Sequence, residues 1–195
     1  MWNAPYPNVY NRQGINQTCL GDDMSDDQQF QLPQPGPEHA LLKPLEGVFA
    51  SEVKMWMGRG EPNVSAGKMT TSFQLGGLYL YHDYKGNPTK GPFPAFEGQG
   101  YFGFNSTSGK FEGFWIDNVS TAMQFEHGSV DETGKVFEMH SDFVMPGFVM
   151  PGTGVRFKKR SIITVTDNDH HTMESYITPP DGSEIKNMVI EYKRV

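Results

Sequence analysis

From residue 42 to residue 195 the chain consists of about ten strand-length runs separated by turn signals. Polar and apolar side chains alternate within these runs, as in residues 51–57, and no stretch has the spacing of a long helix. Hairpin turns are expected at residues 76–77, 105–109, 131–134, 166–169 and 179–182. The pattern predicts an all-β fold, a single antiparallel β-barrel of eight to ten strands over residues 41–195.

The length of the chain fits one barrel with one core, because all-β domains of this size commonly fold as a unit. Apolar residues make up only 36% of the chain while aromatic residues reach 13%, so the core must depend on a few large side chains. Gly98, Gly100 and Gly103 lie in one predicted strand, which indicates strong bending of the kind that barrel closure needs.

The first forty residues form a separate arm with a different composition. They contain one arginine against five acidic residues and so carry −4 of the net charge of −7, and five prolines interrupt them. Such a segment cannot bury enough apolar surface to order itself alone. Trp2, Tyr6 and Tyr10 are spaced as anchors along an extended chain. We expect the arm to dock on a protein partner, while packing on its own barrel and an unrestrained tail are the alternatives.

A second candidate contact surface is a doubled Val-Met-Pro-Gly sequence over residues 144–152. Its two prolines exclude a central strand, so we expect a long apolar loop. This loop is either a lid on the barrel lumen or a contact patch for a partner, through Met145, Phe148 and Met150.

The charge and composition exclude several classes of function. An acidic chain without a basic cluster would repel a phosphate backbone, so we expect no nucleic-acid binding. No run of about twenty apolar residues and no apolar leader after Met1 is present, so we expect a cytoplasmic protein without a membrane span of its own. The arm aromatics would also suit a membrane-embedded partner assembly. Cys19 is the only cysteine, which excludes an intrachain disulfide.

Four motifs in order resemble those of the domain-of-unknown-function 1579 family, bacterial barrels related to the calycins. They are Gly76-Gly77-Leu78-Tyr79-Leu80, Trp115-Ile116-Asp117-Asn118 followed by Ser120-Thr121, Pro180-Asp181-Gly182, and Ile190-Glu191-Tyr192-Lys193-Arg194. The resemblance implies a lumen able to hold a small molecule and carries over no established activity. In this chain Leu78 stands where the family usually has a basic residue.

The segment Gly47-Val48-Phe49 also resembles the Gly-x-Trp start of lipocalin-like barrels. In those barrels an aromatic residue closes one end, and an arginine of the last strand stacks on it. The resemblance implies that Phe49 and Arg194 fill these two places and lie in contact, although Phe replaces Trp here.

Five residues are candidates for contact with a small apolar ligand in the lumen: Phe49, Trp115, Asp117, Tyr192 and Arg194. Trp115 and Asp117 share one strand face and would supply a stacking surface and an acceptor. The alternative is a core tryptophan and an aspartate that caps a turn. Core packing is likewise the alternative for the face of the last strand that carries Tyr192 and Arg194.

No catalytic, metal or cofactor site is predicted. His170 and His171 are adjacent, so their rings point to opposite faces of a strand, and a solvated turn is expected there. His82, His127 and His140 lie on different strands and could converge on a haem or metal, as in related barrels that bind haem, but nothing in the sequence fixes which way they face. Asp117 could approach Glu138 or Glu174, but no local spacing supports hydrolysis, so we expect no enzyme activity.

Two functions are therefore open. The first is a non-catalytic accessory subunit that docks on a larger assembly through the arm and the apolar loop. The second is a calycin-like carrier of a small apolar molecule. A lumen filled by side chains would favour the first function, and a cavity of several hundred Å³ would favour the second.

Overall fold

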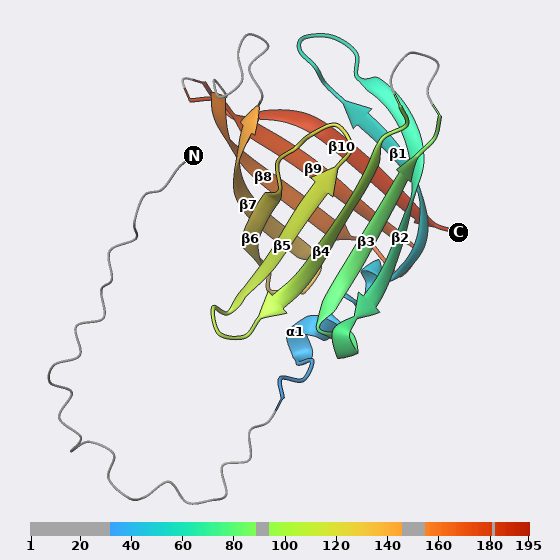
Figure 1. Cartoon of the computed structure of the whole chain (residues 1–195), viewed down its shortest axis with the longest axis vertical. Coiled ribbons are helices and arrows are strands. Elements are labelled where there is room, and N and C mark those ends of the chain that lie inside the picture. Colours follow the sequence, from blue (N-terminus) through green and yellow to red (C-terminus); the bar gives the residue numbers. More distant parts are fainter. Residues whose placement is uncertain (1–31, 89–93, 146–154, 181) are drawn as a thin grey trace, which may run out of the picture. The chain divides into compact units, whose positions relative to one another are not determined.

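The computed structural model describes residues 32–88, 94–145, 155–180 and 182–195, in which ten antiparallel strands close into one barrel (Figure 1). The predicted all-β barrel is thus confirmed, at the upper end of the expected strand number. Each strand pairs with its neighbours in sequence, and β1 pairs with β10. The strands are β1 Gly47–Met55, β2 Asn63–Gln74, β3 Tyr79–Gly86, β4 Glu97–Asn105, β5 Lys110–Asp117, β6 Gln124–Val130, β7 Val136–Met145, β8 Val155–Val165, β9 His170–Thr178 and β10 Ile185–Arg194.

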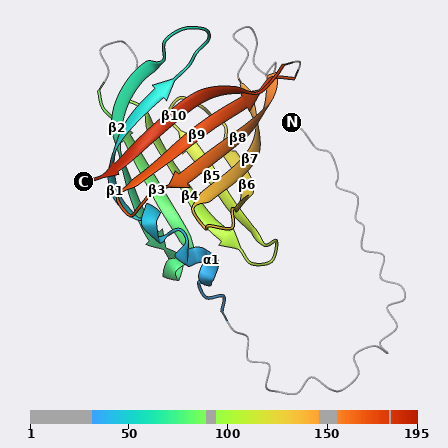
Figure 2. The same cartoon turned by 180° about the vertical axis from the view of Figure 1, so that it is seen from behind.

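A short helical segment covers one end of this barrel (Figure 2). It comprises α1 (Pro37–Ala40) and a 3-10 turn, η1 (Lys43–Leu45), which leads directly into β1. Leu42 and Leu45 point into the barrel and are 0% and 3% exposed. They pack with six inward side chains from five strands: Leu80, Phe102, Phe111, Phe137, Met139 and Val165. The apolar core therefore sits at the covered end, which we call the closed end.

Arg194 stabilises this closed end through a stacking contact and hydrogen bonds. Its guanidinium carbon lies 4.5 Å from the centre of the Phe49 ring, as the resemblance implied. Nη1 donates a hydrogen bond to the carbonyl oxygen of Glu46 (2.7 Å), and Nη2 donates to that of Pro44 (3.0 Å). A Cβ at Gly47 would collide with Nη1, and Gly47 has φ of +135°, so only glycine fits there. The arginine thus joins the last strand to the segment that enters the first.

Most of the predicted partner-binding residues lie outside the described residues. This holds for Trp2, Tyr6 and Tyr10 of the arm and for Phe148 and Met150 of the apolar loop. Met145 is the last residue of β7, and its side chain is likewise not described. Within the described part of the chain, no helix has the length and apolar character needed to cross a membrane.

Candidate functional site

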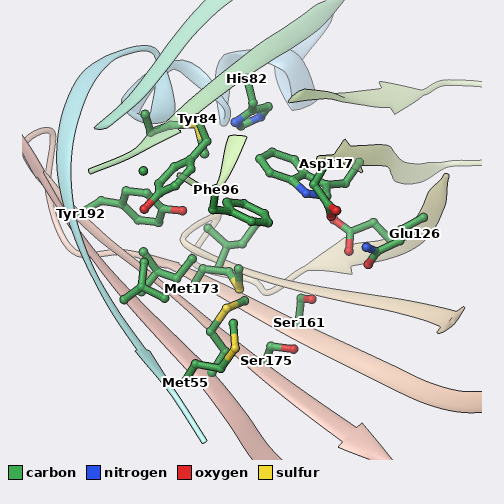
Figure 3. A pocket seen from close by; sticks show the side chains of 18 of the residues that line it. Met55, His82, Tyr84, Phe96, Asp117, Glu126, Ser161, Met173, Ser175 and Tyr192 are labelled. Atoms are coloured by element: carbon green, nitrogen blue, oxygen red, sulfur yellow. The ribbon is translucent and has the colours of Figure 1, made fainter. Parts of the chain in front are cut away.

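Above the apolar core, the barrel encloses a cavity of about 480 Å³ (Figure 3). Its lining runs from Leu45 at the closed end to Asn87, Val119 and Asn187 near the opposite ends of the strands. The cavity exists because the inward side chains change character along the strands. Large phenylalanines pack together at the closed end, whereas serines and methionines join the aromatic residues that face the remaining lumen.

One side of the cavity is an aromatic wall. Trp115 of β5 faces inward and stands opposite Gly100 of β4. A Cβ at Gly98 would overlap the Trp115 indole, so the glycine allows this ring to lie against the barrel wall. Tyr84 and Phe96 extend the wall, with ring centres 5.8 Å apart. Glycine on β4 therefore leaves space in the lumen that a larger residue would remove.

The opposite side is apolar and rich in methionine. Met173 of β9 and Met188 of β10 pack around Ile190, next to Val53 of β1. Met55 lines the same region, and Figure 3 shows it on the same side as Met173. Unbranched thioether side chains adapt to irregular shapes and contact aromatic rings favourably. The two walls together suit an apolar molecule between them.

The part of the cavity next to the core is polar but uncharged at neutral pH. Burial lowers the pKa of His82 to about 4. The pKa of His171 is lowered to about 3, first by burial and then by repulsion from His82 once that ring is protonated and from the charge of Arg194. Burial also raises the pKa of Tyr192, whose ring stacks on His171 at 4.4 Å. All three side chains stay neutral because charging them would place an unpaired charge away from water.

Two charged groups meet farther along the lumen. Nζ of Lys159 on β8 lies 3.9 Å from Oε2 of Glu126 on β6, and their side chains are only 18% and 25% exposed. Both residues line the cavity, as does Asp117 on β5. Oδ1 of Asp117 accepts a hydrogen bond from the backbone N–H of Val119 (3.1 Å). This carboxylate therefore lines the lumen and also caps a turn.

Polar side chains also line the lumen on β8, β9 and β10. Ser161 and Ser175 stand opposite each other in the strand register and are 3% and 1% exposed. On β10 the register shifts between Lys186 and Met188, so the intervening Asn187 and the next residue both line the cavity. A β-bulge of this kind redirects a side chain that regular alternation would place outside.

Three of the five predicted ligand residues line this cavity. They are Trp115, Asp117 and Tyr192. Phe49 and Arg194 are not among the lining residues, because Phe49 is fully buried under Arg194 at the closed end. The contact between Phe49 and Arg194 therefore helps to close the end of the barrel, and neither side chain is available to a ligand in the lumen.

The prediction of a solvated turn at His170 and His171 is wrong for the second residue. The strand begins at His170 without an intervening loop, so His170 stays exposed while His171 is buried in the lumen. As predicted, the two rings lie on opposite faces. Among the other histidines, His82 lines the cavity, whereas His127 and His140 pair side by side and are exposed.

The proposed carboxylate pairs do not form in the lumen. Glu138 contacts His140 and Arg160, and Glu174 contacts Lys186 and Tyr176; neither glutamate lines the cavity. Asp117 instead shares the lumen with Glu126, which the sequence analysis did not single out. Among the described residues, no group of three or more histidine, cysteine, aspartate or glutamate side chains could hold a metal ion.

Comparisons with known proteins agree with this architecture. Rv2717c from M. tuberculosis is 15% identical with a TM-score of 0.59, over 82% of this chain and 98% of that one. The S-type phycobiliprotein lyase from Guillardia theta is 10% identical with a TM-score of 0.51, over 83% and 98%. At these identities the likeness shows the calycin-like fold alone. No curated protein matches the sequence.

The motif series led to the correct family. A family model described as "protein of unknown function (DUF1579)" matches residues 34–194, which include the whole barrel. This chain therefore belongs to the DUF1579 family.

Proposed function

We propose that the barrel is a non-catalytic protein that binds a small, mainly apolar molecule in its lumen. The observation that supports this function most directly is the cavity of about 480 Å³ between the aromatic wall and the methionine-rich wall. Cavities that hold small molecules in proteins typically measure about 300–1,000 Å³ and have a few polar groups on an apolar lining.

The chemistry of the lining agrees with this role. Trp115 offers a flat surface of the kind that stacks on planar groups. Met173 and Met188 can adjust to the outline of a ligand on the other side. His82 and His171 are neutral at physiological pH, so they can hydrogen-bond an uncharged polar group without drawing a counter-ion into the lumen.

Calorimetric titration with 2-acetylnaphthalene, a neutral planar probe, tests this function. We expect saturable binding to the full chain. A Met173→Trp variant should weaken binding at least tenfold, because the larger ring enters the cavity. Thr172→Trp is the matched control: Thr172 is the preceding residue on β9, lies opposite exposed Glu191, and is not among the lining residues.

Two results would argue against lumen binding. One is the absence of saturable binding to the folded wild-type protein. The other is equal loss of binding in both tryptophan variants, which would indicate a general effect of the added ring. Circular dichroism should verify that each variant is folded.

A second candidate function rests on the sequence of the arm. We propose that Trp2, Tyr6 and Tyr10 dock the barrel on a larger protein assembly. The support is their spacing in a Pro-rich, acidic segment that has few other apolar side chains to bury. This function is compatible with lumen binding, since it uses a different part of the chain.

A further inference from the structure

Four polar groups line the β8–β10 side of the lumen, and one of them is buried without a hydrogen-bond partner among the described residues. The hydroxyls of Ser161 and Ser175 are inside the barrel, and Oδ1 of Asn187 is buried without a partner. The fourth group is the ammonium of Lys159, which lies 3.9 Å from its nearest carboxylate, Glu126, beyond hydrogen-bond length. Three of these side chains, Lys159, Ser161 and Ser175, can donate hydrogen bonds into the lumen and are therefore available to an acceptor group of a ligand.

These side chains form one continuous surface. Lys159 and Ser161 are two residues apart on β8 and therefore face the same side of the sheet. Ser161 pairs with Ser175 on β9, and Ser175 pairs with Met188, next to Asn187 on β10. Figure 3 shows the two serines as neighbours at the edge of the cavity, on the side of Met173. We call Lys159, Ser161 and Ser175 the donor patch.

The donor patch has the chemistry of an anion site. One ammonium and two hydroxyls can donate to the two oxygens of a carboxylate, and hydrogen bonds to an ionised group are the stronger kind. The amide N–H of Asn187 can add a further donor at the edge of the patch, whereas its buried Oδ1 is an acceptor and needs a donor from another group. Trp115 and Met173 leave room for an apolar body beside it.

Two carboxylates on the facing strands, Asp117 and Glu126, would repel a bound anion. Asp117 lines the lumen on β5, but one of its oxygens already accepts the N–H of Val119. Glu126 attracts Lys159 from a distance that allows no direct hydrogen bond. A ligand carboxylate at hydrogen-bond distance would therefore replace a loose ion pair with a closer one.

We propose that the lumen ligand carries a carboxylate that binds Lys159, Ser161 and Ser175, with its apolar body between Trp115 and Met173. This inference rests on the proposed lumen-binding function and adds the chemical class of the ligand. The ligand is thus an amphipathic carboxylic acid, held as its anion.

Three naphthalene probes with the same ring test the inference by calorimetry at pH 7.5. They are naphthalene-2-carboxylate, neutral 2-acetylnaphthalene and cationic 2-(aminomethyl)naphthalene. We expect the carboxylate to bind the full-length protein at least tenfold more tightly than the neutral ketone. The amine should bind most weakly, because it meets the ammonium of Lys159.

Substitutions then assign the preference to the donor patch. Lys159→Gln should reduce carboxylate affinity at least tenfold and change ketone affinity less than twofold. Ser175→Ala should reduce carboxylate affinity a few-fold. Glu126→Gln should increase it, because a competing carboxylate is removed. Lys158→Gln is the matched control, since this neighbouring lysine is exposed, and it should change neither affinity.

The possible results separate the two proposals. If the ketone binds and the carboxylate binds no better, the lumen function stands and the carboxylate inference is wrong. If the amine binds most tightly and Glu126→Gln removes that binding, the ligand is a cation and the inference is again wrong. If none of the three probes binds, both proposals fail. These comparisons begin with the wild-type protein, so they hold even if one variant does not fold.

Discussion

The guanidinium of Arg194 lies over the ring of Phe49, and the two residues are also directly opposite in the β1–β10 register. The stacking pair therefore marks the seam at which the first and last strands close the barrel. The same guanidinium donates hydrogen bonds to carbonyl groups of Pro44, Glu46 and Asn168, from two other segments of the closed end. One side chain thus joins three parts of the chain that are far apart in sequence.

Arg194→Lys should destabilise the barrel although it keeps the charge. A lysine cannot present the planar fork that reaches several carbonyl oxygens at once, so we expect a loss of about 2 kcal/mol in the free energy of unfolding. Urea denaturation followed by circular dichroism measures this loss. Lys193→Gln, at the exposed neighbouring position, is the control. Equal stability of the Arg194→Lys variant and the wild type would show that the pair is incidental to closure.

Stability should fall as the pH decreases from 6.5 towards 4. In the unfolded chain His82 and His171 take up protons near pH 6.5, whereas in the barrel their pKa values are about 4 and about 3. The unfolded state therefore binds more protons in this range. The free energy of unfolding should drop by up to about 1.4 kcal/mol per pH unit for each histidine and be fully retained above pH 6.5.

Urea midpoints at pH 7.5, 6 and 5 measure this dependence. His82→Gln should reduce the slope by about half, because one of the two lumen histidines with a lowered pKa no longer titrates. His127→Gln, at an exposed position, should leave the slope unchanged. A wild-type slope that is flat between pH 6.5 and 5 would contradict the assignment of neutral buried histidines.

Gly98→Ala should weaken ligand binding indirectly, through its effect on the neighbouring Trp115 side chain. The added methyl group would overlap the Trp115 indole and push it towards the lumen. We expect at least a tenfold loss of affinity for 2-acetylnaphthalene and a stability loss of about 1–3 kcal/mol from overpacking. Gln99→Ala, at the exposed next residue of β4, is the control for both measurements. Unchanged affinity of the Gly98→Ala variant would show that the Trp115 indole moves without reducing the cavity.

Deletion of residues 1–33 should leave the barrel folded and able to bind the naphthalene probes. The compact unit begins at Gln34, and the core residues Leu42 and Leu45 remain. If the arm docks on a partner, the shortened chain should no longer co-elute with protein partners captured by the full chain in gel filtration. Triple replacement of Trp2, Tyr6 and Tyr10 by serine should have the same effect. Retention of partners by both variants would direct attention to the apolar loop.

Alternation of polar and apolar residues is sufficient to predict the strands, whereas the contact between Phe49 and Arg194 follows from the resemblance to lipocalin-like barrels. It could also have located part of the donor patch: counting back in steps of two from buried Val165 passes Ile163 and reaches Ser161 and Lys159. The contact between Lys159 and Glu126 could not be predicted, because it depends on the register of β6, β7 and β8. A shift of two residues keeps each side chain on its face and changes all its neighbours.

Two further features lay beyond simple alternation. Asn187 faces the lumen only because of the bulge in β10, and no glycine or proline marks that position in the sequence. The polar residues Asp167, Asn168 and Asp169 are typical of a turn and stand directly before His170 and His171. The strand begins immediately after those residues, which the turn composition does not reveal.

The pairing of β1 with β10 also has a consequence for biosynthesis. The ribosome releases β1 long before β10, so the hydrogen-bonding edge of β1 that later faces β10 has no native neighbour while the other strands emerge. Contacts between such distant segments also slow folding. The nascent chain therefore passes through a stage with an open sheet edge, which a chaperone could protect and at which a second nascent chain could pair wrongly.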